Sequence, residues 1–524
     1  MNEFTSRYSD QISGVVTGFD RLVFRGNLSL IHDSGMKGYL WANGIAWKDY
    51  AQHVSDVSQQ VKRASLAPME VAGRPIRYLN NGKESKEEIA RAIARQDGIT
   101  SGPICALTAV EPCLTWRVVG NRETRKLHLL RGMRQCLFVY HYWIDEVFGF
   151  MSARLQTWFP FALYVYMNGR AWLARQMDQA GMRYQRHDNC FPWIEDFSRA
   201  QALMDEQLKT DWTAALNACA SRIHPLFPHL TANYPMNYYW TAFQSEWAMD
   251  IVFRDSEQLR RLYPQLIHLG MVGFSSPDVM RFMDKKVSSR GKALGPAHEV
   301  VSDMKVRSEG VRIKHRLGKN SIKLYDKAYS PQGAVLRPEI TMNAPGQFRV
   351  FRHKAGQDEG PMQWRQLRAG VADLHRRAEV SQKALDRYCT ALARVDDTTT
   401  LREITAPLEK RVRWNGRPVR AFHPFESGDL ELLRAIARGE FTINGLRNRD
   451  LQALLYAEPP ATKQEAQRRS AVVSRKLRLL RAHGIIRKLP HTHRYLVSDN
   501  GRLRINAILS AQRTTSQQLT TLAA

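Results

Sequence analysis

Cysteine is scarce in this chain of 524 residues, which contains only six. No two of them form a Cys-x-x-Cys pair, which excludes metal-finger spacing and the density of a disulfide framework. We therefore expect free, buried thiols in a reducing cytosol at Cys105, Cys113, Cys136, Cys190, Cys219 and Cys389.

Long hydrophobic runs are also missing. The longest, "TWFPFALYVYM" at residues 157–167, falls far short of the roughly 20 residues that a spanning helix needs. The first residues, "MNEFTSRYSDQ", are polar and lack an apolar signal core. The sequence thus predicts a soluble, cytoplasmic protein with no membrane partner. It has neither a Walker loop nor a G-x-G-x-x-G motif, which argues against nucleotide-driven and dinucleotide chemistry.

Positive charge is abundant. Lys and Arg number 77 against 50 Asp and Glu, a formal net charge of +27. Such an excess repels itself in the folded chain, and a polyanion relieves that repulsion. Nucleic acid is the commonest polyanionic partner, because binding to phosphates releases counterions. A basic surface kept for solubility is the alternative.

The alternation of strand-like and helix-like segments predicts an α+β fold. The length suits about three domains at roughly 150 residues each. We expect an α/β N-terminal domain over 1–235, a basic α+β domain over 236–360, a linking helix over 361–413 and a DNA-binding domain over 414–515.

Local patterns predict individual elements. We expect a hairpin over 12–30, a helix over 85–99, two strands joined at Glu111-Pro112 over 102–120, strands and then a helix from Gly169 over 136–181, helices over 195–235 and around 240–284, and a long amphipathic helix over 362–399.

Residues 401–524 hold 23 Lys and Arg against 10 Asp and Glu, a net +13 on under a quarter of the chain. Three helices are predicted here, over 428–441, 447–457 and 463–485, followed by a hairpin over 486–501. In the third helix Val473, Leu477 and Leu480 have helical spacing and should pack inward. The residues that offer donors to base edges and phosphates are Gln467, Ser470, Ser474, Arg475, Arg478 and Arg481, with Arg487, Lys488, His491, His493 and Arg494 in the hairpin.

The stretch "SRKLRLLRAHGIIRKLPHTHRYLVSDNGR" resembles the winged helix-turn-helix of MarR- and ArsR-type bacterial regulators. That resemblance implies that the third helix enters the major groove of double-stranded DNA and that the hairpin touches the minor groove. The same module used for protein contact or for RNA is the alternative. A metal site at the two histidines of the hairpin is a weaker interpretation than phosphate contact.

A second basic stretch is "SIKLYDKAYSPQGAVLRPEITMN", residues 321–343. It predicts two strands, Ile322–Tyr325 and Val335–Thr341, joined by a turn. Upstream cations alternate with apolar residues, so one face should be basic and suited to a phosphate backbone. That face would carry Arg312, Lys314, Arg316, Lys319 and Lys323; a merely solvated sheet face is the alternative.

"KLYDK" followed by "LRPEIT" resembles replication initiation proteins of plasmids and filamentous phages. The resemblance implies strand nicking by a tyrosine, aided by a divalent metal. Tyr325 would then be the nucleophile, with Lys327 and Arg337 stabilising the developing charge. Glu339 would hold Mg²⁺ or Mn²⁺ together with Glu246 or Asp250. The His-hydrophobic-His motif common in such enzymes is absent from a strand context.

Other acidic residues beside predicted strands are Asp20, Glu111 and Asp145, which together would suit a two-metal nuclease. The aromatic cluster Tyr140, His141, Tyr142, Trp143, Trp158 and Phe159 is either a stacking platform or core.

The sequence as a whole favours a DNA-binding protein of bacterial regulatory or mobile-element type. A metal-dependent nicking enzyme is the first alternative and an RNA-binding protein the second. A homodimer is one alternative assembly, and no cofactor is expected unless the protein is a nuclease.

Overall fold

The computed structural model describes residues 2–515, except 81–83, 122, 124–125, 286–298, 308–309, 331–332, 355–359, 397–399, 439–440, 442–444 and 491. It has both helices and a large sheet, which confirms the α+β class. Among the described residues, none of the helices is long and apolar enough to cross a membrane.

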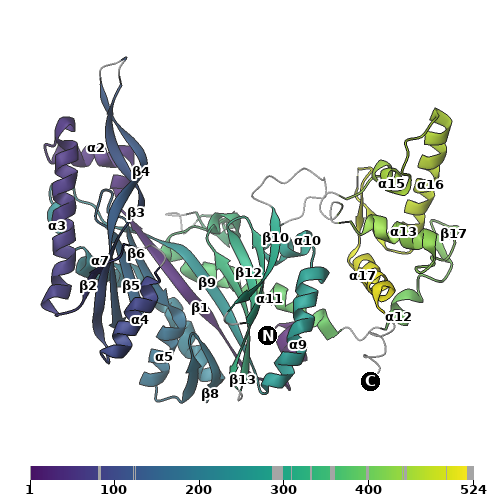
Figure 1. The fold of residues 1–524 in the computed structure, drawn as a ribbon, viewed down its shortest axis with the longest axis horizontal. Coiled ribbons are helices and arrows are strands. Elements are labelled where there is room, and N and C mark those ends of the chain that lie inside the picture. The colour runs from purple at the N-terminus through teal and green to yellow at the C-terminus, as the bar shows by residue number, and fades with distance from the viewer. Residues whose placement is uncertain are drawn as a thin grey trace.

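One sheet of eleven strands forms the body of the molecule (Figure 1). Its order is β10-β11-β12-β13-β9-β1-β6-β5-β4-β3-β2, and every neighbouring pair is antiparallel except β2 and β3. The strands are β1 (Ile12–Asn27), β2 (Ile76–Tyr78), β3 (Gly102–Gly120), β4 (Leu127–Asp145), β5 (Gly149–Gln156), β6 (Leu163–Asn168), β9 (Tyr239–Phe253), β10 (Val300–Arg307), β11 (Gly310–Leu317), β12 (Asn320–Ser330) and β13 (Gly333–Met342).

One face of the sheet is covered by helices that share the main hydrophobic core. They include α1 (Glu3–Arg7), α2 (Asp33–Ala42), α3 (Tyr50–Val71), α7 (Trp212–Ile223), α9 (Ser256–His268), α10 (Ser276–Phe282) and α11 (Leu374–Leu392). The short α8 (Phe227–Leu230) also lies beside this core.

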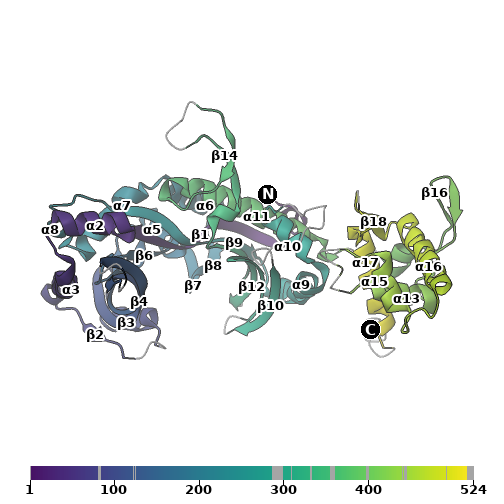
Figure 2. The same cartoon turned by 90° about the horizontal axis from the view of Figure 1, so that it is seen from above.

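The opposite face is covered only in part. The helices α5 (Gly169–Gln179) and α6 (Phe197–Glu206), with the hairpin β7 (Tyr184–His187) and β8 (Cys190–Ile194), pack on one end of β1. The helix α4 (Lys86–Gln96) packs on β3 and its neighbours. Figure 2 shows β3 and β4 curling at the end of the sheet far from the C-terminal helices.

Two further small hairpins lie outside the main sheet. In the body, β14 (Arg349–Arg352) pairs with β15 (Gln363–Gln366), and in the C-terminal part of the chain β16 (Val412–Trp414) pairs with β17 (Arg417–Val419).

The C-terminal unit, residues 401–515, has its own hydrophobic core, which extends from Leu408 to Ile508. Its elements are α12 (Leu401–Thr405), α13 (Ser427–Ile436), α15 (Asn448–Leu455), α16 (Lys463–Ala482), β18 (Ile486–Lys488), β19 (Tyr495–Val497) and α17 (Asp499–Arg513), besides the β16–β17 hairpin. Three helices followed by a hairpin occur in the predicted order. The assignment to the winged-helix family stays a prediction.

Three predictions of local structure are wrong. The expected hairpin over 12–30 is the single strand β1, because its glycines admit helix α6 instead of making a turn. A Cβ added at Gly14 would lie 2.1 Å from Phe197, and one at Gly18 would lie 2.3 Å from Met204. The segment 102–120 is likewise one strand, β3, in which the predicted turn at Glu111-Pro112 pairs with β4 instead.

The segment around 240–253 forms the central strand β9 and not a helix. Both of its faces are covered toward its C-terminal end, so its apolar residues run on without the alternation that marks a half-exposed strand. The predicted long helix over 362–399 begins only at Leu374, and its apolar side packs on β9 and β13. The helices over 85–99 and from Gly169, and the β12–β13 hairpin, are confirmed.

A disulfide joins Cys113 on β3 to Cys136 on β4, so the expectation of free thiols is wrong for these two. The strand register pairs Glu111 with Cys136 and Cys113 with Arg134, which leaves the two cysteines diagonal on adjacent strands, with their Cα atoms 6.1 Å apart. Their separation of 23 residues conceals this contact in the sequence. The other four cysteines are free and buried.

Candidate functional site

Three carboxylates meet on three adjacent strands of the sheet. Asp20 lies in an irregularity of β1, Glu246 on β9 and Glu339 on β13, and one oxygen from each lies within 4.8 Å of the others. Asp20 and Glu339 are buried, while Glu246 is half-buried. Clustered carboxylates of this kind either hold a cation or are neutralised by a protein cation.

Lys323 is the protein cation at this cluster. Its Nζ donates to Glu339 Oε1 at 2.6 Å and to Glu246 Oε1 at 3.4 Å. The Thr341 hydroxyl lies 3.5 Å from the same two oxygens. Burial opposes the charge on Lys323, but Glu339 and Glu246 raise the pKa of this ammonium group. An ion bound by the carboxylates would therefore compete with Lys323.

Asp250 belongs to a neighbouring buried network. Arg170 Nε lies 2.9 Å from Asp250 Oδ2, and Arg337 donates to both carboxylate oxygens, at 2.8 Å for Oδ2. Burial alone would raise the pKa of Asp250, but the two guanidinium groups lower it below its ordinary value. Asp250 is a counter-ion of two arginines and does not join the three clustered carboxylates.

Asn189 links the two networks. Its side-chain amide donates to both oxygens of Asp20, at 3.0 and 3.1 Å, and accepts from Lys327 Nζ at 2.8 Å. Arg337 Nη1 lies 3.6 Å from Asp20 Oδ1. Neither Asn189 nor Arg170 was identified from the sequence, because a turn asparagine and a helical arginine have no distinguishing local pattern.

The two buried members of the carboxylate cluster hold protons more strongly than free side chains do. Burial raises the pKa of Asp20, although Arg337 and Arg170 oppose it. Burial and the neighbouring Glu246 raise the pKa of Glu339 against the influence of Lys323. Perturbed carboxylates that converge in this way mark candidate functional sites.

Tyr325, the predicted nucleophile, is half-buried on β12 at the edge of this cluster. Its ring centroid lies 5.9 Å from Arg312 Cζ and 6.0 Å from the Nζ atoms of Lys323 and Lys327. Burial and the neighbouring Glu339 raise the pKa of Tyr325 to about 12 against the influence of Lys323 and Arg312. The phenol is therefore protonated at neutral pH and would need activation to attack a phosphodiester.

The register places the basic residues of β11 on the same sheet face as Tyr325. Arg312 pairs with Tyr325 and Lys314 with Lys323, while Ile313 and Leu317 turn into the core. Arg316 and Lys319 are exposed, and Arg312 and Lys314 are half-buried. Lys323 and Lys327 are buried and already bound, so they contribute less to this basic face than the alternation predicts.

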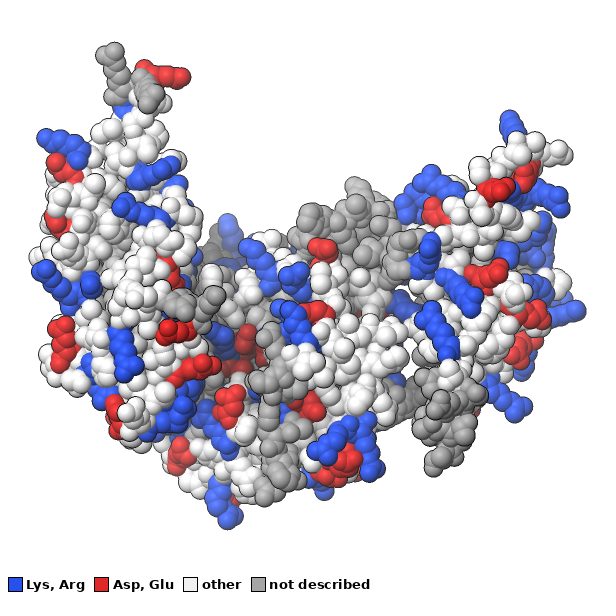
Figure 3. Space-filling model, viewed as in Figure 1, with Lys and Arg blue, Asp and Glu red and all other residues white. Residues whose placement is uncertain are grey.

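In the C-terminal unit, α16 buries Val473, Leu477 and Leu480 as predicted. Figure 3 shows Lys and Arg side chains crowding the surface of this unit. The predicted contact residues that are exposed are Gln467, Ser474, Arg475, Arg478, Arg487, Lys488 and His493; Arg481 and Arg494 are half-buried.

Three predicted contact residues, Ser470, Ser474 and Arg481, also make contacts within the unit. The Asn448 amide donates to the backbone oxygen of Ser470 and to Ser474 Oγ, at 3.0 and 2.9 Å, which joins α15 to α16. Arg481 lies over Trp414 of the β16–β17 hairpin, 5.2 Å from the ring centroid. His491 lies outside the described residues.

The remaining acidic and aromatic candidates lie elsewhere. Glu111 contacts Lys86 at 3.1 Å and Arg154 at 3.3 Å on the β3–β5 side, and Asp145 accepts backbone N–H groups in the β4–β5 turn. Of the aromatic cluster, His141, Tyr142, Trp143 and Phe159 are buried, so its members serve mainly as core.

No family model matches the chain, and no curated protein matches it. The solved structures that it resembles include the di-domain ARO/CYC BexL from the BE-7585A biosynthetic pathway, 9% identical over 58% of this chain and 92% of that one, with a TM-score of 0.13. The di-domain ARO/CYC StfQ from the steffimycin biosynthetic pathway is also 9% identical, over 59% and 94%, with a TM-score of 0.14. TM-scores this low support no inference about fold or function.

Proposed function

We propose that the protein binds double-stranded DNA through its C-terminal unit. The observation that carries the proposal is the exposed row of donors on α16 and β18, which turns away from the unit's core. Arg475 and Arg478 of this row lie on the helix, and Arg487 and Lys488 on the hairpin. Donors on one helix face suit base edges, and those on a hairpin suit the phosphates beside them.

The β16–β17 hairpin extends this surface. Its tip is an Asn-Gly turn in which Asn415 has φ 48° and Gly416 has φ 74°, the conformation of a tight hairpin turn. A pocket of about 470 Å³ lies between this hairpin, α16 and β19, and includes Arg417, Arg478 and Arg481 but no carboxylate. Positive charge without acidic partners favours phosphate binding.

Replacing Arg478 by alanine tests the proposal. We expect Arg478→Ala to weaken binding to a duplex selected from a random library by about 1 to 3 kcal/mol and to relax the sequence preference. Gel-shift titration at one fixed salt concentration measures both effects. Arg513→Ala, which removes an exposed arginine from α17, is the matched control.

Unchanged affinity for Arg478→Ala would contradict the proposal. Equal or tighter binding of double-stranded RNA of the same sequence would favour the RNA-binding alternative.

A second candidate function is metal-dependent cleavage of a DNA strand, favoured by the meeting of Asp20, Glu246 and Glu339 beside Tyr325. Hard oxygen donors suit Mg²⁺ or Mn²⁺, which would supply positive charge at a phosphodiester. Within this function Lys323 and Arg312 would orient the phosphate, and Tyr325 would be the nucleophile.

Incubation with supercoiled plasmid and Mg²⁺ or Mn²⁺ tests this function. We expect the wild type to relax the plasmid, and both Tyr325→Phe and Glu339→Gln to abolish relaxation. The control Glu257→Gln, at a residue of α9 whose side chain is 44% exposed, should be fully active. Absence of relaxation by the wild type in either metal would exclude the nicking function without affecting DNA binding.

A further inference from the structure

A pocket of about 250 Å³ opens among β1, β3, β4, β5 and β6, on the part of the sheet that the α4, α5 and α6 helices leave uncovered. Three arginines line it, Arg25 from β1, Arg131 from β4 and Arg154 from β5, and no carboxylate does. The pocket belongs neither to the carboxylate cluster nor to the C-terminal unit.

Aromatic rings orient these arginines. Arg154 Cζ lies 4.2 Å from the centroid of the Tyr164 ring, and Arg25 Cζ lies 5.4 Å from the same centroid. Arg131 Cζ lies 5.5 Å from the Trp116 ring. Stacked guanidinium groups lose less freedom when they bind an anion, because the ring already restricts them.

The positive charge of the pocket is largely unneutralised. Arg154 has one acidic neighbour, Glu111, at 3.3 Å. Within the described part of the chain, neither Arg25 nor Arg131 has a carboxylate within ion-pairing distance, and Arg25 Nε is buried without a hydrogen-bond acceptor. A buried donor without a partner costs free energy, which a bound anion would recover.

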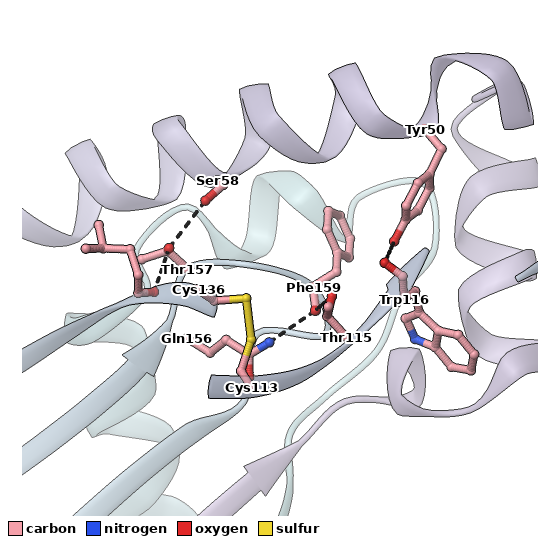
Figure 4. The surroundings of a disulfide bond; sticks show 10 residues. Tyr50, Ser58, Cys113, Thr115, Trp116, Cys136, Gln156, Thr157 and Phe159 are labelled. Atoms are coloured by element: carbon pink, nitrogen blue, oxygen red, sulfur yellow. Dashed lines mark hydrogen bonds between the residues drawn. A yellow bond between two sulfur atoms is a disulfide. The ribbon is translucent and has the colours of Figure 1, made fainter. Parts of the chain in front are cut away.

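The wall of the pocket is rigid. Cys113, which lines it, is tied to β4 by the disulfide with Cys136, and the Thr115 hydroxyl and the Gln156 amide both donate to the backbone oxygen of Phe159, at 2.7 and 3.1 Å (Figure 4). The Trp116 indole donates to the backbone oxygen of Leu30 at 2.7 Å. Because these contacts already fix the wall, it loses little conformational entropy when a ligand binds.

We propose that this pocket binds one nucleotide, with its phosphate on the arginines and its base against the aromatic wall of Phe138 and Tyr164. The volume lies just under the range of about 300 to 1,000 Å³ typical of small-molecule sites, so a double helix cannot enter. Arginine with aromatic side chains is the combination that binds unpaired nucleotides. The nucleotide is either free or one unit of a single strand.

A bound single strand would connect the pocket with the rest of the sheet. Arg21, four residues before Arg25 on β1, lies with its Cζ 5.0 Å from the centroid of the Tyr166 ring. In the strand register Arg21 lies opposite Glu246 of β9. Four residues of strand span about 13 Å, so a single strand anchored in the pocket extends to the carboxylate cluster. The pocket itself does not rest on either proposed function.

Two binding measurements on the full chain test the proposal. Calorimetry measures the binding of adenosine monophosphate, and fluorescence anisotropy measures the binding of a labelled single-stranded oligonucleotide. The C-terminal unit is saturated beforehand with unlabelled duplex. We expect the Arg25→Gln/Arg131→Gln double variant to weaken binding at least tenfold, and Arg117→Gln, an exposed arginine of β3 outside the pocket, to bind as the wild type does.

Binding of the monophosphate identifies a free-nucleotide site, and binding of the oligonucleotide alone identifies a strand site. Failure of both ligands to bind the wild type would overturn the proposal, as would equal binding by the double variant with an unchanged unfolding temperature. Neither failure would alter duplex binding by the C-terminal unit, so the two proposals are separable.

Discussion

Buried carboxylates in this protein take two different roles that depend on their immediate partners. Asp250 is held by two guanidinium groups that lower its pKa, so it remains ionised as a fixed counter-ion. Asp20 and Glu339 have raised pKa values, since burial outweighs their cationic neighbours. Of these three carboxylates, Asp20 and Glu339 are therefore the ones that favour binding a proton or a cation.

At this scale we expect Asp250→Asn to lower the free energy of unfolding at pH 7 by about 3 to 5 kcal/mol, because it removes the carboxylate that both Arg170 and Arg337 contact and leaves Arg337 with only the more distant Asp20. In the wild type, a lowered pKa means that the contribution of Asp250 is present above its unfolded value of 3.8 and is lost as the pH falls further.

Urea unfolding at several pH values between 7 and 3 measures both effects. Glu257→Gln, which breaks two solvent-accessible pairs with Arg260 and Arg261, should change stability by less than about 1 kcal/mol. A loss no larger in Asp250→Asn than in this control would show that the arginines find other partners.

At the scale of elements, glycines determine how closely helices approach the sheet. Gly169 is the first residue of α5, and a Cβ there would lie 1.6 Å from the backbone oxygen of Phe19 on β1. The next residue is Arg170, which reaches Asp250 from this helix. The close approach of α5 to β1 therefore positions one half of the buried network.

We expect Gly169→Ala to destabilise the protein by about 1 to 3 kcal/mol, since the backbone of β1 cannot yield as a flexible side chain would. Gly346→Ala, where nothing lies within 4 Å of the added Cβ, is the matched control. Thermal unfolding compares the two, and equal midpoints would contradict the role given to Gly169.

At the scale of the whole molecule, the C-terminal unit is docked on the body. Arg502 of α17 lies 2.9 Å from Asp278 of α10, and a pocket of about 180 Å³ lies between the two parts. Figure 1 shows the unit beside α10 and β10, at the opposite end of the sheet from the β3–β4 hairpin. Duplex held by the unit and nucleotide held by the pocket would therefore occupy different ends of one molecule.

Local sequence patterns were sufficient for elements whose stabilising contacts are near in sequence. In α16, Thr462 accepts from the Glu465 backbone and Gly484 follows the helix with φ 68°, as start and stop signals require. In the β12–β13 hairpin, alternation alone placed the apolar side chains on one face and the polar ones on the other, although polar residues such as Lys323 and Glu339 are buried as well. Local patterns failed in β1, where glycines allow a helix to pack closely instead of forming a turn. They also failed in β9, where both faces are covered and the alternation of a half-exposed strand is lost.

The sequence by itself determined the charge, the α+β class and which side chains of the 321–343 hairpin share a face, because these depend on composition and on the two-residue period of a strand. Only the tertiary structure decided that Asp20 joins Glu246 and Glu339, that Lys323 neutralises them, and that three arginines surround one pocket. These residues come from strands far apart in the chain, and hydrogen bonding between β1, β9 and β13 brings the carboxylates together.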